Sequence, residues 1–297
     1  MAGSLVALSM VSGSALALTP EVSLSAQAGY RTDGMDWQAS SATTGEQWTT
    51  EWGDLNIFHA RLGAEVKLDR VYLRGMFGYG VVTDGWSFDQ SNRDAGTTNE
   101  IISDTTGDVL DADIAIGYSF LLRSVEHRHL FLMPTIGYSY HEQNFEEDNG
   151  FNRTTQADIA TFARKYNVEW EGVWVGLNLW EVDKSQDFTI AAELAYYFSD
   201  FYAAGDLAGD PAEASYQHPK SFGHGIASSL GMRFSLYGNY ALSPSLDLVF
   251  GFDYQTWKAE DGTQRNRLSD GTTEDLTLEV VNWESVSMNA GLAYFFY

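Results

Sequence analysis

Apolar and polar residues alternate with a period of two along most of the chain, and no long window shows the 3.6-residue period of an amphipathic helix. In residues 58–62, Phe58, Ala60 and Leu62 are apolar, and polar residues lie between them. Because successive side chains of a β-strand point to opposite faces, this pattern is typical of strands with one apolar face. The alternation predicts an all-β fold with ten strands, over residues 22–30, 58–68, 71–81, 110–120, 130–140, 173–179, 188–198, 226–240, 246–254 and 286–296.

The connections between these predicted strands alternate between short and long. Residues 69–70, 121–128, 181–187 and 242–245 are short, whereas residues 32–52, 85–108, 142–166, 200–223 and 258–280 each exceed twenty residues. Long structureless loops are uncommon in compact soluble domains. Short periplasmic turns and long extracellular loops are typical of outer-membrane barrels. We therefore predict a transmembrane antiparallel β-barrel of about ten strands, with a soluble β-sandwich or lipocalin-like barrel as the alternative.

Aromatic residues gather near the ends of the predicted strands, on their apolar faces. They include Tyr30, Tyr79, Tyr118, Tyr138, Tyr140, Tyr196, Tyr240, Tyr254 and Tyr294. Membrane barrels carry such aromatic girdles at both membrane–water interfaces. The chain also ends inside the last strand, with Tyr294 and Phe296 on the apolar face, which resembles the terminal signal of outer-membrane barrels. Together these features predict an integral protein of a bacterial outer membrane.

The first residues resemble a secretory signal peptide. Residues 5–11 form a short apolar run, and Ser14-Ala15-Leu16-Ala17 contains an A-x-A cleavage pattern. The run is too short to span a bilayer. A signal peptide opens with basic residues, yet the first one here is Arg31, so residues 1–17 are expected to be a signal peptide truncated at its start. The mature chain, residues 18–297, is then a single barrel.

The charge balance excludes several classes of function. The chain has 41 acidic and 17 basic residues, with a formal net charge of −24 at pH 7. Nucleic acid is therefore not an expected partner, because phosphate binding needs a basic surface. The absence of Cys excludes disulfides, thiolate metal sites and Cys nucleophiles. Much of the negative charge falls in the long connections, which predicts an acidic extracellular face suited to cationic peptides or proteins.

The polar faces of the strands define the expected lining of the lumen. They contribute His59, Arg61, Glu65, Arg74, Asp111, Asp113, Glu193, Arg233, Asp247 and Asp253. A ten-strand barrel is only slightly wider than the eight-strand size that side chains fill. We expect these charges to pair across the lumen as a structural polar core, with a small, narrow pore as the alternative. Alternation over residues 55–68 and 226–240 exceeds the roughly 9–11 residues of a spanning strand, so the wall should project outward.

Three short motifs accompany this architecture: Ala290-Gly291-Leu292 with Tyr294 and Phe296 in the last strand, Ser103-Asp104-Thr105 with Asp111-Ala112-Asp113-Ile114 near the fourth strand, and Val175-Gly176-Leu177 in the sixth. In architecture and in these motifs the chain resembles the omptins, a family of outer-membrane proteases with ten strands, overhanging walls and five external loops. The resemblance implies a ten-strand barrel and, if the catalytic groups are present, an endopeptidase that acts on basic peptides.

The omptin catalytic pairs are not matched in this chain. The resemblance implies an Asp-x-Asp pair facing an Asp-x-His pair, with a water between them that attacks the peptide. Here Asp84 and Asp89 are five positions apart, and Tyr216 precedes His218 by two positions. The candidate catalytic residues are thus Asp84, Asp89, Asp210 and His218, brought together only if the loops fold appropriately.

Three functions remain open from the sequence. The first is an outer-membrane surface barrel with acidic extracellular loops and a structural, adhesive or binding role. The second is an omptin-like aspartic-type endopeptidase, and the third is a small pore. No cofactor or metal is expected, and the expected partners are outer-membrane lipids, lipopolysaccharide and cationic peptides or proteins.

Overall fold

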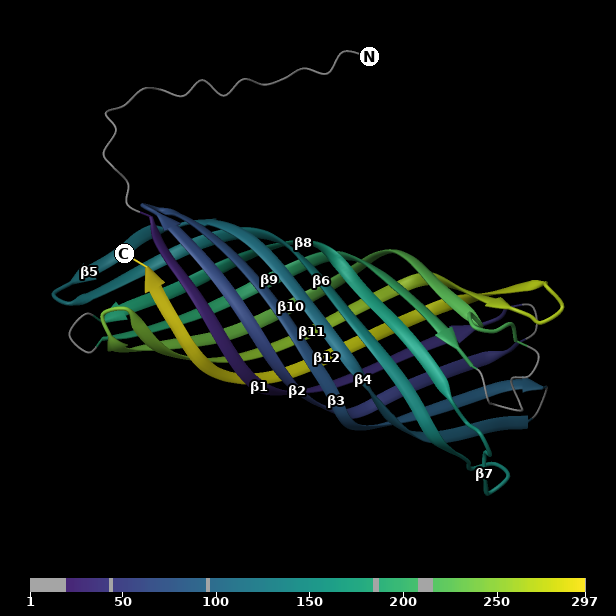
Figure 1. The fold of residues 1–297 in the computed structure, drawn as a ribbon. Helices are drawn as coiled ribbons and strands as arrows, with labels where there is room; N and C mark the ends of the chain where they lie inside the picture. Colours follow the sequence, from purple (N-terminus) through teal and green to yellow (C-terminus); the bar gives the residue numbers. More distant parts are fainter. Residues whose placement is uncertain (1–19, 43–44, 95–96, 184–186, 208–215, 297) are drawn as a thin grey trace, which may run out of the picture.

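The computed structural model describes residues 20–42, 45–94, 97–183, 187–207 and 216–296, whose strands form one antiparallel sheet that closes on itself (Figure 1). The expected signal peptide, residues 1–17, lies outside the described residues. Ten long strands make the wall: β1 (Glu21–Ser40), β2 (Gln47–Leu68), β3 (Val71–Asp94), β4 (Thr97–Tyr118), β6 (Arg128–Asn152), β8 (Arg164–Asp183), β9 (Phe188–Asp206), β10 (Phe222–Ser243), β11 (Leu246–Arg267) and β12 (Thr273–Phe296).

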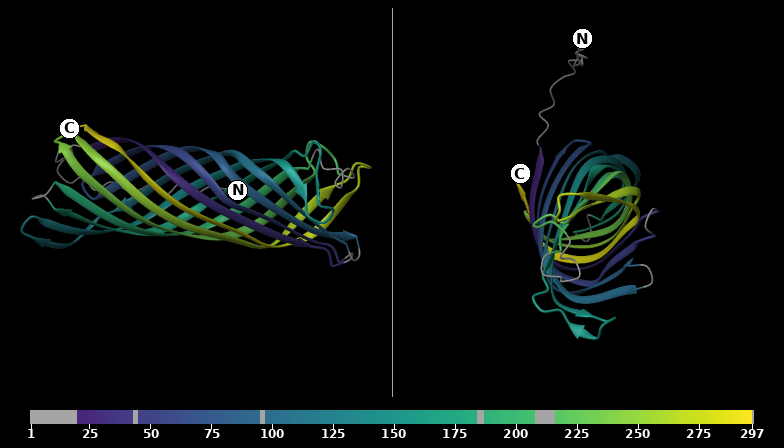
Figure 2. Two further views of the ribbon diagram at one scale, coloured as in Figure 1. Left: turned by 90° about the horizontal axis from the view of Figure 1, so that it is seen from below. Right: turned by 90° about the vertical axis from the view of Figure 1, so that its right-hand side faces the viewer.

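Consecutive long strands pair with one another, and β12 returns to pair with β1 along nearly its whole length. Two short strands lie outside this ring of ten. β5 (Phe120–Val125) continues the line of β4 along β6, and β7 (Ala157–Asp158) pairs with the far end of β6. The view along the molecule shows the closed ring (Figure 2). The described residues include no helix with the length and apolar character needed to cross a membrane.

A band of exposed apolar side chains surrounds the half of the barrel that holds the short turns. On β1, Leu24 and Tyr30 are exposed, and on β12 the corresponding residues are Met288, Leu292 and Tyr294. Exposed apolar side chains in such number are typical of a surface that faces lipid. The tyrosines at the two margins of the band form the girdles predicted from the sequence.

Four of the five expected long loops, residues 32–52, 85–108, 142–166 and 258–280, are mostly strand and extend the wall past the apolar band. In the fifth, residues 200–223, β9 continues to Asp206 and β10 begins at Phe222, and residues 208–215 lie outside the described residues. Just beyond the apolar band, the apolar residues switch from the outer face of the strand to the inner face. On β1 the apolar residues face outward up to Tyr30, whereas Met35, Trp37 and Ala39 face inward and are buried. The sequence pattern was interrupted at this change of phase, which is why the strands were predicted to end too early.

The connection expected at residues 121–128 is also partly strand. It forms a hairpin in which β5 pairs with the start of β6 and projects at the end of the barrel where β1 begins and β12 ends (Figure 1). The barrel therefore has two different halves: a membrane half with apolar residues outside, and an extracellular half with apolar residues inside.

Candidate functional site

The membrane half encloses a cavity of about 560 Å³ at the periplasmic end of the lumen. Its lining combines polar groups such as Arg74 and Asn178 with the rings of Tyr72 and Trp180. All four side chains belong to the inward-facing set of their strands. The cavity is therefore a part of the lumen that these side chains line without filling.

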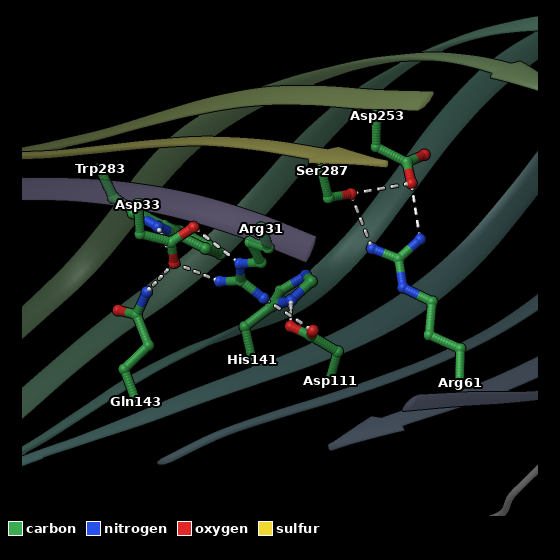
Figure 3. Close-up of polar contacts among 9 residues, drawn as sticks. All are labelled: Arg31, Asp33, Arg61, Asp111, His141, Gln143, Asp253, Trp283 and Ser287. Atoms are coloured by element: carbon green, nitrogen blue, oxygen red, sulfur yellow. Dashed lines mark hydrogen bonds and ion pairs between the residues drawn. The ribbon is translucent and has the colours of Figure 1, made fainter. Parts of the chain in front are cut away.

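Ion pairs bound this cavity toward the extracellular side. Arg74 donates to both carboxylate oxygens of Glu193, at 3.0 and 3.2 Å, and Arg233 donates to the same carboxylate at 2.7 Å. Arg61 donates to Asp253 at 2.6 Å and to Ser287 at 3.0 Å (Figure 3). Charged groups in a buried site are tolerated when they are paired and hydrogen-bonded in this way. The expectation of charges paired across the lumen is confirmed for these five charged residues, whereas neither ring nitrogen of His59 has a hydrogen-bond partner within the described part of the chain.

A second polar cluster lies next to this layer (Figure 3). The Arg31 guanidinium binds Asp33 with two nitrogens and reaches Asp111 at 2.8 Å. Asp33 also accepts hydrogen bonds from Gln143 and from the Trp283 indole, each at 3.1 Å. The two carboxylates, which come from β1 and β4, are thus held on one buried cation.

His141 completes this cluster and forms a dyad with Asp111. Its Nδ1 lies 2.7 Å from the Asp111 carboxylate, and the rings of Trp257 and Trp283 pack against the imidazole at 5.2 and 5.5 Å. A carboxylate that orients a histidine is a common catalytic arrangement. Here, however, the side chain is only 6% exposed, so a substrate in solution has no access to it.

Above the polar clusters, aromatic side chains fill the lumen of the extracellular half. We call the indoles of Trp37, Trp52, Trp170, Trp257 and Trp283 the aromatic plug. They come from five strands around the ring, and each is at most 2% exposed. Ring centroids lie 4.6 Å apart for Trp37 and Trp52 and 5.6 Å apart for Trp257 and Trp283. These distances are typical of direct aromatic packing, so the plug is a hydrophobic core.

A third charged cluster lies beside the plug, outside the apolar band. Arg164 pairs with Asp89, which also accepts a hydrogen bond from Thr50 at 2.6 Å. Glu147 accepts a hydrogen bond from the Trp52 indole at 2.8 Å. The pKa of Glu147 is raised to about 8, mainly because the carboxyl is buried and also because the Asp89 carboxylate lies near it. Arg164 lowers this pKa, but by less. Burial beside a second carboxylate therefore favours the protonated form of Glu147.

The structure places the four candidate catalytic residues in different surroundings. Asp84 is exposed and faces outward, whereas Asp89 is buried against Arg164 on the inner face of β3. His218 forms a pair with Asp206, with 2.6 Å between Nδ1 and the carboxylate, and its side chain is 39% exposed. Asp210 lies outside the described residues. The contacts therefore bring His218 to Asp206 and Asp89 to Arg164.

Sequence reasoning missed Arg31, Asp33, His141, Glu147 and Arg164. Asp33, Glu147 and Arg164 fall in segments that were expected to be loops, and Arg31 and His141 lie one residue before such segments, just past the predicted strand ends. Continuing the period-two pattern from Arg31 through Asp33 to the buried Trp37 would have placed the first two in the lumen. Within the described residues, no group of three metal-ligating side chains is arranged to hold an ion.

The fold is shared with a solved outer-membrane barrel. The outer-membrane protease OmpT from Escherichia coli superposes with a TM-score of 0.72 at 14% sequence identity, covering 93% of this chain and 97% of that one. The translocator domain of the autotransporter NalP from Neisseria meningitidis covers 94% of this chain and 89% of its own at 12% identity, with a TM-score of 0.40. No curated protein sequence matches the chain significantly.

The closed ring of ten strands and its apolar band define an integral outer-membrane β-barrel with the omptin architecture. The family model of the Protochlamydia outer membrane protein, Pom, matches residues 25–296. The chain therefore belongs to the Pom family. The resemblance to omptins is one of fold.

Proposed function

We propose that this protein is a non-enzymatic, non-conducting surface barrel whose acidic extracellular half binds cationic peptides or proteins. The aromatic plug carries the proposal. In the extracellular half of the barrel, the lumen is occupied by a packed hydrophobic core. Such a core supports a rigid mount for an outer surface better than it supports a groove or a channel.

The outer surface of the extracellular half supports the choice of a cationic partner. Carboxylates occupy outward positions on neighbouring strands, and like charges face each other across strands: Glu142 opposite Glu169, and Glu171 opposite Asp200. Burial, Glu142 and Glu171 together raise the pKa of Glu169. Like charges directly opposite each other destabilise a sheet. An approaching cation relieves this repulsion and is attracted over a distance of about 10 Å at moderate ionic strength.

Lipids are the second class of partner that we propose. The exposed apolar band contacts the bilayer, and its tyrosines lie at the level of the headgroups. Lipopolysaccharide is the corresponding lipid of the outer leaflet, and its sugars would surround the projecting wall.

A binding measurement tests the proposed function. The full chain is refolded into lipid nanodiscs and titrated with a fluorescent oligolysine, with empty nanodiscs as the control. We expect saturable binding that weakens steeply between 50 and roughly 200 mM salt, because the attraction is screened. Binding that is absent at low salt, or that is independent of salt, would overturn the proposal.

An omptin-like endopeptidase is the alternative, and the pair formed by Asp206 and His218 favours it. This pair is at the extracellular end, and the histidine is accessible. The test is cleavage of a dibasic fluorogenic peptide by the refolded protein with lipopolysaccharide. We expect no turnover, whereas turnover that His218→Ala abolishes would establish the endopeptidase.

A pore is the remaining alternative. Single-channel recording in planar bilayers is expected to give a silent trace, because the plug and the ion pairs occupy the lumen. Regular conductance steps would contradict the non-conducting barrel.

A further inference from the structure

A row of apolar side chains crosses the outer wall of the extracellular half. Phe88 of β3 is the cross-strand neighbour of Ile102 of β4, which in turn neighbours Phe151 of β6. The residues on either side of Phe88 and of Ile102 are buried, so by strand alternation these side chains point outward. Ile102 is 37% exposed, and the two phenylalanines are partly exposed. We call these three residues the apolar row.

Lipid does not account for this exposure. The apolar band ends on β4 near Leu110, and Ile102 lies roughly 26 Å further along the strand at the usual rise per residue. The outward positions between them are Asp104, Thr106 and Asp108, which are polar. An apolar patch that water surrounds is typical of an interaction surface.

Carboxylates surround the apolar row. Glu51 is the cross-strand partner of Phe88, and Asp158 is the partner of Phe151. Glu100 and Asp104 lie two residues before and after Ile102 on the same face of β4. A partner that covers the row must therefore combine an apolar stripe with positive charge on both sides of it.

The chain itself shows how a cation fits at this place. The Arg153 guanidinium lies over the Phe88 ring, 5.9 Å from its centroid, and its Nε is 3.8 Å from a Glu100 oxygen. A cation thus makes a cation–π contact and an ion pair at the edge of the row. The same chemistry is available to Lys or Arg side chains of a partner.

We propose that the apolar row and its surrounding carboxylates dock a cationic amphipathic helix of a polypeptide partner. Neighbouring strands are about 4.8 Å apart, so the three side chains span about 10 Å. Apolar residues at i, i+3 or i+4, and i+7 of a helix span about 10.5 Å. The helix therefore lies across the strands, with one apolar residue against each strand. This inference rests on the proposed binding of cationic partners, and it locates their binding site at the apolar row on the outer wall.

The test compares two peptides of the same composition. One is a helical peptide of Lys and Leu with Leu at i, i+3, i+4 and i+7, and the other is its scrambled sequence. The full chain in nanodiscs is expected to bind the helical peptide about tenfold more tightly than the scrambled one, since only the former buries a continuous apolar stripe. The double substitution Ile102→Ser with Phe151→Ser is expected to remove this preference.

The controls separate failure of the site from failure of the proposed function. Tyr202→Ser on β9 removes an outward side chain that is also 37% exposed, and it should leave the preference unchanged. If the wild-type chain binds both peptides equally, the row is not the site, although the acidic surface still binds cations. If it binds neither peptide at low salt, the proposed function fails too.

A second pair of variants leaves the apolar side chains in place, in case the serine variants do not fold. Glu51→Gln with Asp158→Asn is expected to weaken helix binding several-fold, whereas Glu284→Gln on β12, away from the row, should not. If the double variant and Glu284→Gln weaken binding of the helical peptide equally, the apolar row is not the binding site. A change in oligomeric state with the serine variants, without a change in peptide binding, would instead assign the row to contacts between copies.

Discussion

At the scale of single residues, the stability of the lumen depends on individual side chains that compensate more than one buried charge. Glu193 is the clearest case, because one carboxylate compensates both Arg74 and Arg233 and its side chain has 0% exposure. Close packing imposes similar demands. A Cβ atom at Gly231 would lie 2.6 Å from the ring of Trp257, its cross-strand partner, so only glycine leaves room for that indole.

The substitution Glu193→Gln tests the charge balance of the lumen. It leaves two buried guanidinium groups without their common carboxylate, and removing one partner from a buried ion pair destabilises by about 3–5 kcal/mol. We expect a loss of this order in urea unfolding of the refolded barrel. The matched control is Glu21→Gln, since Glu21 pairs with Lys67 while 62% exposed and should cost less than about 1 kcal/mol. Equal losses would contradict the assigned role.

At the scale of elements, a strand such as β1 changes the direction of its apolar face once, from outward at Tyr30 to inward at Met35. This change explains how much the sequence could predict. The number of strands, their order and the girdles follow from the alternation in the membrane half. The upper parts of β1 and β6 could not be predicted, because polar residues such as Asp33 and Gln143 enter the lumen where the pattern reverses.

The candidate site was predictable only where its residues lie in the membrane half. Arg61, Asp111, Glu193 and Asp253 were expected in the lumen and are there, the last three buried and Arg61 paired with Asp253. Their partners across the barrel depend on register and strand tilt, which a single sequence does not specify. For the same reason the pairs of Arg31 with Asp111 and of Arg164 with Asp89 could not be anticipated.

Glu147, at the extracellular end of β6, is a group whose protonation changes the stability of the extracellular half. Glu147 faces Asp89, Arg164 and Tyr166, and its pKa is about 8 compared with 4.5 for an unperturbed glutamate. Between these values the folded chain keeps a proton that the unfolded chain has released. The free energy of unfolding therefore falls as pH rises from about 4.5 to about 8 and is independent of this group above that range.

Glu147→Gln is the variant that isolates this effect. A neutral side chain of the same shape removes the pH dependence, so the difference in urea midpoint between variant and wild type should increase from pH 5 to pH 9. An unchanged difference across this range would show that Glu147 does not titrate there.

At the scale of the whole molecule, two barrels of opposite polarity share the same strands. The membrane half has a polar lumen and an apolar surface, and the extracellular half has an aromatic core and a charged surface. Different surroundings stabilise the two halves, so a destabilising substitution in the plug need not unfold the strands in the bilayer.

Trp257→Ala tests this independence. Replacing a fully buried indole by alanine costs about 3–5 kcal/mol, and we expect the extracellular strands to become sensitive to protease while the strands in the nanodisc stay protected. Leu248→Ala is the control, because Leu248 is 40% exposed within the apolar band. Cleavage that proceeds through the membrane half as well would show that the two halves unfold together.

The reversal of the apolar face also has a thermal consequence. Exposing the aromatic core to water on unfolding raises the heat capacity, whereas lipid-facing side chains contribute little while they remain in the bilayer. The stability curve of the extracellular half should therefore be strongly curved with temperature, with a maximum near ambient conditions. The membrane half should respond more gradually, so that cooling or heating loosens the surface that meets partners before it loosens the anchor.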